Sequence, residues 1–173
     1  MRRKNGFTLV EIVTVVIMLA ILMIIAAPKL INLQTDANKA KLINMQNAIN
    51  TANIMVYGKA VSQGKSDTNE DIIILATDSM VDSAFGYIQA TKIALESVLN
   101  VKFDDAQTID GNNEWIIQEN AFGVGFVPSV EIWRRNVSAD VTLNETTTAC
   151  SLIYTPATVL TRTPSVTIQT DAC

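Results

Sequence analysis

An uninterrupted apolar block near the N-terminus is the strongest pattern along the chain. Residues 7–27 carry one charge, Glu11, and follow a short basic segment that contains Arg2, Arg3 and Lys4. As an α-helix this block would be about 31 Å long, close to the hydrocarbon thickness of a bilayer. Basic residues before an apolar span favour a cytoplasmic location for that end. The pattern therefore predicts a membrane-spanning helix.

The helical pattern continues beyond the apolar block. Residues 29–57 contain neither glycine nor proline, and apolar residues recur three to four positions apart, which predicts an amphipathic helix that ends near Gly58. Pro28 removes a backbone donor, so we expect a kink or a weakened helix around residues 23–28. The expected apolar face comprises Leu30, Leu33, Ala37, Ala40, Ile43, Ala48, Ala52 and Met55, and the polar face Asp36, Lys39, Lys41, Asn44 and Asn47.

The remainder of the chain predicts a smaller mixed domain. Residues 62–69 read as a loop, a second helix is expected from Asp82 or Ser83 to about Leu99, and residues 101–113 read as turns. We expect Trp115 and Trp133 to be core or sheet residues rather than ligand-stacking residues. Helices followed by strands predict an α+β fold, with an antiparallel sheet packed against the long helix. The expected strands are Glu114–Glu119, Ser129–Asn136, Ala149–Thr155 and Pro164–Thr170.

Composition excludes several kinds of chemistry. The chain has no histidine, which excludes Ser-His-Asp catalysis, Cys-His catalysis and histidine-ligated metals. No other acid-base-nucleophile pattern is discernible, so we expect neither an enzyme nor a cofactor or metal. The net charge is −4 although the N-terminal segment is basic, which argues against nucleic acid as the main partner.

The chain has two cysteines, Cys150 and Cys173. Their spacing is not that of a C-x-x-C redox or zinc motif. A widely spaced pair that closes a C-terminal loop suits a disulfide, and hence an oxidising compartment outside the cytoplasm. The alternative is two unrelated buried thiols.

The acidic segment around residue 110 is a candidate calcium site. It contains Asp104, Asp105, Asp110 and Glu114, and the run from Asp110 to Asn113 resembles a fragment of a calcium loop. The full calcium-loop pattern with its distal glutamate is missing, so we expect a solvated turn. The basic pair Arg134 and Arg135 is too short for a nucleic-acid site, and we expect it to pair with acidic side chains.

Glu11 requires an explanation, because a carboxylate inside a membrane span costs roughly 3 kcal/mol. If the chain is cut between Gly6 and Phe7, the new α-amino group of Phe7 lies about one helical turn from Glu11. The two charges could pair within one subunit or between staggered subunits, and only the second arrangement gives a polymer its register. A plain signal anchor leaves Glu11 unexplained, and a secretory signal cut after Ala27 would place Pro28 directly after the scissile bond.

The string Gly6-Phe7-Thr8-Leu9-Val10-Glu11 after a short basic leader resembles the type IV prepilin signature. The resemblance implies that a prepilin peptidase cuts after Gly6 and N-methylates Phe7. It assigns Glu11 to subunit recruitment and register, and pilins of this kind also carry a proline at the position of Pro28. Residues 27–37, 151–158 and 170–173 further resemble the mannose-sensitive haemagglutinin group of type IVa pilins.

This resemblance implies a pilin fold and a structural subunit of a type IV pilus, used for attachment, with motility as a further use. The implied partners are other copies of the chain, the prepilin peptidase, the pilus assembly machinery, and a host or surface ligand. The precursor would span the bacterial inner membrane once and later form an extracellular filament. Expected segments are a leader (1–6), a transmembrane and assembly half-helix (7–28), an amphipathic half-helix (29–57) and a head (58–173) with a disulfide-bounded region (150–173).

Two other functions fit the same N-terminus. A pseudopilin of type II secretion shares the signature, although the loop between Cys150 and Cys173 favours a pilin. A monomeric signal-anchored binding protein, such as a sugar binder, would be indifferent to replacement of Glu11 and would keep its leader.

Overall fold

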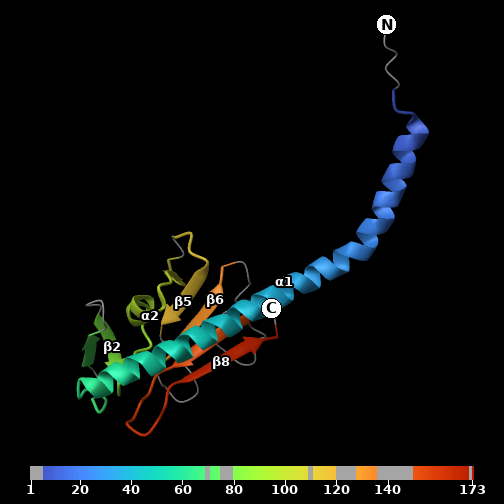
Figure 1. Cartoon of the computed structure of the whole chain (residues 1–173). Helices are drawn as coiled ribbons and strands as arrows, with labels where there is room; N and C mark the ends of the chain where they lie inside the picture. Colours follow the sequence, from blue (N-terminus) through green and yellow to red (C-terminus); the bar gives the residue numbers. More distant parts are fainter. Residues whose placement is uncertain are drawn as a thin grey trace. The chain divides into compact units, whose positions relative to one another are not determined.

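The computed structural model describes residues 6–68, 71–74, 80–108, 111–119, 128–135, 150–171 and 173. It divides into two compact units, residues 1–37 and Asn38–Cys173, and each is described by itself. The long helix α1 contributes to both (Figure 1). The helices and strands are α1 (Leu9–Ser62), β1 (Asp71–Ile74), β2 (Met80–Ala84), β3 (Tyr87–Ile88), α2 (Lys92–Leu99), β4 (Phe103–Asp105), β5 (Trp115–Glu119), β6 (Val130–Arg134), β7 (Cys150–Thr155) and β8 (Ser165–Thr170).

The first unit consists of the N-terminal part of α1. The helix is continuous across Pro28, so the proline does not end it. Proline leaves one backbone acceptor of the preceding turn without its donor, which a membrane helix tolerates. The kink that the sequence suggests around residues 23–28 stays a prediction.

The end of α1 differs from the expectation. The helix passes through Gly58 and ends at Ser62. Gly64 has a φ of 68° and follows as the left-handed residue. The N–H of Lys65 donates to the Ala60 carbonyl at 2.9 Å and that of Gly64 to the Val61 carbonyl at 3.1 Å. This pair of bonds is a Schellman motif, so Gly64 rather than Gly58 terminates the helix.

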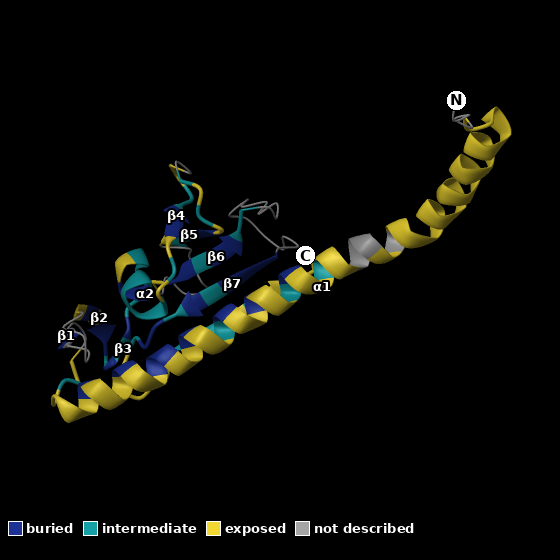
Figure 2. Ribbon diagram, turned by 45° about the horizontal axis from the view of Figure 1, so that its top comes forward, coloured by how far each residue is buried: buried dark blue, intermediate teal, exposed yellow. Residues whose placement is uncertain are grey.

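In the second unit, α1 buries a face that differs from the predicted one. Of the residues expected on the apolar face, Ala52 is buried, but Ile43 and Met55 are 47% and 58% exposed. Two apolar stripes at helical spacing run along this segment, and periodicity alone does not decide which one meets the sheet. The buried face, visible in dark blue in Figure 2, comprises Asn38, Leu42, Met45, Ile49, Ala52, Asn53, Val56 and Ala60.

The larger sheet has the order β4-β5-β6-β7-β8. Its strands β5 to β8 match the four predicted strands. They pair antiparallel, but β4 pairs parallel to β5, so the sheet is mixed rather than purely antiparallel. Strand β4 comes from a segment predicted as turns, where buried Phe103 contributes to the core.

The predicted second helix is wrong over its first half. Residues 80–88 instead form the hairpin of β2 and β3, which belongs to a three-stranded antiparallel sheet with β1. Ala84 pairs with Tyr87, and both loop residues, Phe85 and Gly86, have positive φ, as in a type I′ turn. The helix α2 starts later, where the hydroxyl of Thr91 accepts a hydrogen bond from the Ala94 N–H at 3.2 Å.

The second unit, Asn38–Cys173, is called the head from here on, and its core lies between α1 and the sheets. Trp115 and Trp133 are buried, as the sequence predicted. The Tyr154 hydroxyl donates to the Ile88 carbonyl and lies 3.1 Å from the Asn53 amide oxygen, which also accepts from the Ile88 N–H. Since these groups come from β7, β3 and α1, the network holds both sheets to the helix. Burial raises the pKa of Tyr154, so its hydroxyl stays a donor.

Two ion-pair groups lie at one edge of the head. Glu114 pairs with Lys41 of α1 and with Arg134 of β6. Arg135 pairs with Asp104, which also accepts from the Asn113 N–H at 3.0 Å. The prediction that the two arginines pair with acidic side chains is confirmed. The expected solvated turn is wrong for Asp104, which is 4% exposed, because its ion pair and hydrogen bonds compensate its burial.

The predicted disulfide between Cys150 and Cys173 is present. Cys150 opens β7 and pairs with Thr170 at the end of β8, so the bond closes the open end of this hairpin. Strand β8 is also bonded to α1, because the side-chain amide of Gln46 donates to the Val166 carbonyl at 2.9 Å. The last strand is therefore held both by a covalent bond and by the helix.

We predict that the double substitution Cys150→Ser with Cys173→Ser lowers the free energy of unfolding of the head by about 3 kcal/mol. The physical reason is that the disulfide limits the conformational freedom of the unfolded chain. Denaturant unfolding of the full chain in detergent, followed by tryptophan fluorescence, measures the difference. A reductant should destabilise the original protein and leave the double variant unchanged; equal stability of all four samples would contradict the prediction.

We also predict that the head loses stability as the pH falls below the ordinary glutamate pKa of 4.5. The Lys41 ammonium lowers the pKa of Glu114. Burial opposes ionisation of Glu96, but the Phe103 N–H and Lys102 outweigh it and lower the pKa of Glu96. Groups with a lowered folded-state pKa stabilise the protein above their unfolded pKa, and this contribution disappears as pH falls through the folded value.

Thermal unfolding followed by circular dichroism at several pH values tests this prediction. The midpoint temperature of the original chain should be lower in acid than at neutral pH. Glu96→Gln should lower the midpoint at neutral pH, so that its midpoint changes less between neutral pH and acid. Glu131→Gln on β6 serves as a control, because the Glu131 side chain takes part in no hydrogen bond or ion pair within the described part of the chain. If the midpoint of Glu96→Gln fell with pH as steeply as that of the original chain, Glu96 would not contribute to the acid sensitivity.

Candidate functional site

The first turn of α1 is defined by Thr8. The helix begins at Leu9, and residues 6–8 are not helical. The Thr8 hydroxyl accepts a hydrogen bond from the Glu11 N–H at 3.3 Å, and the Thr8 carbonyl accepts from the N–H groups of Glu11 and Ile12. Thr8 is therefore the N-cap residue of α1.

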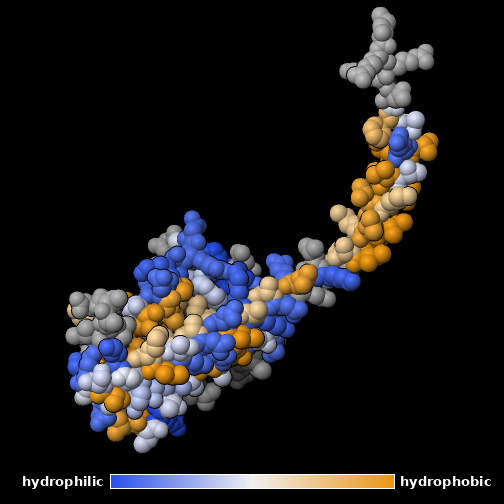
Figure 3. Space-filling view, in the orientation of Figure 1, coloured by the Kyte–Doolittle hydropathy of each residue, from blue (hydrophilic) through white to orange (hydrophobic). Residues whose placement is uncertain are grey.

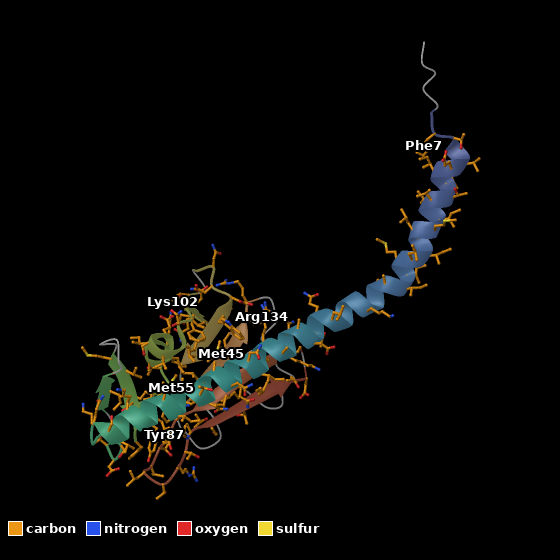
Figure 4. All side chains as sticks on the ribbon, in the orientation of Figure 1. Phe7, Met45, Met55, Tyr87, Lys102 and Arg134 are labelled. Carbon is orange, nitrogen blue, oxygen red and sulfur yellow. A yellow bond between two sulfur atoms is a disulfide. The ribbon has the colours of Figure 1, made fainter. Side chains whose placement is uncertain are left out.

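The bond between Gly6 and Phe7 lies upstream of this cap. The Phe7 side chain is 78% exposed and lies next to the start of α1 (Figure 4). Apart from Gly6 itself and its chain neighbours, no atom of the described residues lies within 4 Å of the position that a Cβ on Gly6 would take. Within the described part of the chain, the Gly6 carbonyl accepts no backbone hydrogen bond. The predicted cleavage point is thus an open, non-helical peptide bond.

Glu11 lies in the exposed first turn, and its own carbonyl accepts a hydrogen bond from the Thr14 hydroxyl at 2.9 Å. No ion pair of its carboxylate occurs among the residues that the structure describes. The chain is uncleaved, so the Phe7 nitrogen is an uncharged amide. Sequence reasoning explained Glu11 by its charge alone and missed Thr8. The sequence pattern that could have predicted this cap is the Thr-x-x-Glu spacing from Thr8 to Glu11, which is the spacing of a capping box.

The following helical surface is almost wholly apolar. Residues Leu9–Ala27 form a segment of mean hydropathy 3.0, long and apolar enough to cross a membrane, and none of it is buried. Its large apolar side chains are between 46% (Val13) and 80% (Leu9) exposed. Figure 3 shows the resulting orange surface along this part of α1. Such a surface requires lipid or other apolar helices around it.

The structure groups the predicted site residues into two places. Gly6, Phe7 and Glu11 lie at the start of α1, and Cys150 and Cys173 are joined in the head. Pro28 lies within the helix of the first unit, and its side chain is not among those described.

The head offers little that resembles a catalytic or metal site. Asp110 of the predicted acidic segment lies outside the described residues. Among the described ones, no group of three or more Cys, Asp or Glu side chains could hold a metal ion. A hollow of about 370 Å³ has no charged side chain among the described residues that line it, which are Ala84, Gln89, Ala90, Thr91, Pro128, Pro156, Ala157 and Thr158.

Comparison with protein families gives one match. Residues 1–27 match the family described as the prokaryotic N-terminal methylation motif. Comparisons with curated proteins and with solved structures gave no match. The matched family is a prepilin-type structural motif rather than an enzyme family, and it implies processing by a prepilin peptidase. Together with the exposed apolar helix, it supports membrane anchoring as a precursor.

The chain thus combines a prepilin-type methylation motif, an N-terminal apolar helix and an α+β head with a C-terminal disulfide, which is consistent with a type IV pilin-like protein.

Proposed function

We propose that this protein is a structural subunit of a type IV pilus, cleaved between Gly6 and Phe7, N-methylated at Phe7 and polymerised through the first half of α1. The observation that carries the proposal is that the methylation motif coincides with an apolar helix of which no part is buried in the chain itself. A helix with this surface needs a lipid or protein environment throughout its life.

The charges of the N-terminus support polymerisation with a fixed register. Cleavage adds water across the Gly6–Phe7 bond and releases the Phe7 amine as a cation, and methylation keeps that charge. The carboxylate of Glu11 is then the complementary group. An unpaired carboxylate among apolar helices is costly, so a packed bundle favours the stagger that places each amine beside a neighbour's Glu11.

The rest of the chain fits this use. Residues 1–6 act as the leader and residues 7–28 as the transmembrane and assembly segment. Residues 29–57 are the amphipathic half of α1, which belongs to the head from Asn38 onwards, and residues 58–173 complete the head. The precursor resides in the bacterial inner membrane and the mature subunit in an extracellular filament. The head, including the disulfide-bounded region 150–173, forms the outer surface and contacts a host or surface ligand during attachment.

A pseudopilin of type II secretion is the second candidate, because the methylation motif fits it equally well. The two differ in their products. A pilus subunit yields long extracellular fibres, and its loss leaves secretion intact. Loss of a pseudopilin abolishes secretion of folded substrates. Deletion of the gene followed by both assays decides between the two.

We predict that protein sheared from the cell surface begins with N-methylated Phe7. Mass spectrometry of the N-terminal peptide measures both the cut and the added methyl group. The membrane fraction of cells without prepilin peptidase should contain the chain with Met1 to Gly6 still attached. Sheared protein that retains these residues would contradict the proposal.

We further predict that Glu11→Ala leaves cleavage intact and abolishes filaments, because the amine of Phe7 loses its partner. Immunoblots of membranes report cleavage, and electron microscopy of sheared material reports filaments. Asp36→Ala is a matched control, since it removes an exposed carboxylate from the same helix. Glu11→Asp, which keeps the charge, should restore part of the filament yield. Normal filaments from Glu11→Ala would show that charge pairing does not set the register.

A further inference from the structure

We infer that Thr8 is a positioning residue for processing, which ends α1 short of the scissile bond and keeps the Gly6–Phe7 peptide open to the peptidase. The inference rests on the proposed function, since it concerns the same cleavage. Its observations are the hydrogen bond from the Glu11 N–H to the Thr8 hydroxyl and the non-helical backbone of residues 6–8.

A peptidase needs access to the carbonyl carbon of the bond that it cuts. Hydrolysis forms a bond between a water oxygen and the Gly6 carbonyl carbon and breaks the bond to the Phe7 nitrogen, leaving a carboxylate and an amine. In a helix that included Gly6, the Gly6 carbonyl would accept the N–H of Val10 and lie within the first turn. In this structure the first carbonyl that accepts amides of α1 is that of Thr8, which accepts from Glu11 and Ile12, and the Gly6 carbonyl accepts no backbone hydrogen bond from the described residues.

The sequence contains a competing start for the helix. Asn5 is another residue of a type that caps helices well, and it lies three positions before Thr8. A helix capped at Asn5 would include Gly6 and Phe7 as its first two helical residues. The apolar residues that follow favour helix in either case, so the choice of cap decides whether the scissile bond is helical.

The Thr8 hydroxyl therefore selects the later start. Valine has the shape of threonine but no acceptor, so Thr8→Val removes the cap with little change in volume. Serine keeps the hydroxyl and is at least as good a cap. This pair of variants separates capping from shape and from contact with the peptidase.

The experiment uses the full-length chain in membrane vesicles with prepilin peptidase, and mass spectrometry follows release of the leader. Thr8→Val should reduce the cleavage efficiency about fivefold, and Thr8→Ser should match the original chain. The loss should lie in KM rather than kcat, because the cap changes only the fraction of precursor that is competent to bind. Cleavage of Thr8→Val at the original rate would overturn the inference, as would equal loss in Thr8→Ser.

A second measurement reports the helix start directly. Hydrogen exchange of the precursor in micelles should show the Leu9 and Val10 amides unprotected in the original chain. In Thr8→Val these two amides should be protected, because they donate to the Asn5 and Gly6 carbonyls once the helix starts earlier. Unchanged exchange would overturn the inference even if cleavage slowed. If the original chain is not cleaved at all, the proposed function fails together with this inference, whereas a failure confined to the variants leaves the proposed function intact.

Discussion

The apolar surface of Leu9–Ala27 must be covered by something other than water, and this constraint governs the rest of the chain. The segment is long and apolar enough to span a membrane, and none of it is buried. It needs lipid while the chain is a precursor and other apolar helices if the chain assembles. A surface that is satisfied equally well by either environment allows transfer from one to the other without refolding, which is a requirement for a subunit assembled out of a membrane.

The head is independent of that surface because it is built on a different part of the same helix. Its core uses the face of α1 that contains Leu42, Met45, Ile49 and Val56, all in the second unit. The network around Tyr154 and Asn53 ties this face to both sheets, and the disulfide closes the last hairpin. The environment of Leu9–Ala27 can therefore change while the packing of the head stays the same.

Sequence reasoning succeeded where one signal dominated and failed where two signals competed. For the apolar block, the strands β5 to β8 and the disulfide, one sequence signal outweighed the alternatives. The prediction of the buried face of α1 was wrong, because Ile43 and Met55 follow helical spacing as well as Leu42 and Met45 do. The β2–β3 hairpin was missed because Phe85 adopts a positive φ, for which asparagine or glycine is the usual sign. The burial of Asp104 was also missed, because the groups that compensate its charge, Arg135 and Asn113, lie far from it in the sequence.

On the proposed function, the start of α1 links processing to assembly through two kinds of interaction within one helical turn. Thr8 acts on the backbone, where its hydroxyl accepts the Glu11 N–H and fixes the first helical residue. The Glu11 carboxylate is left exposed, without an ion pair in the described part of the uncleaved chain. On the proposed function, cleavage supplies the missing cation at Phe7, next to the cap. The precursor then lacks the charge that fixes the stagger between subunits, so register can be set only after the leader has been removed.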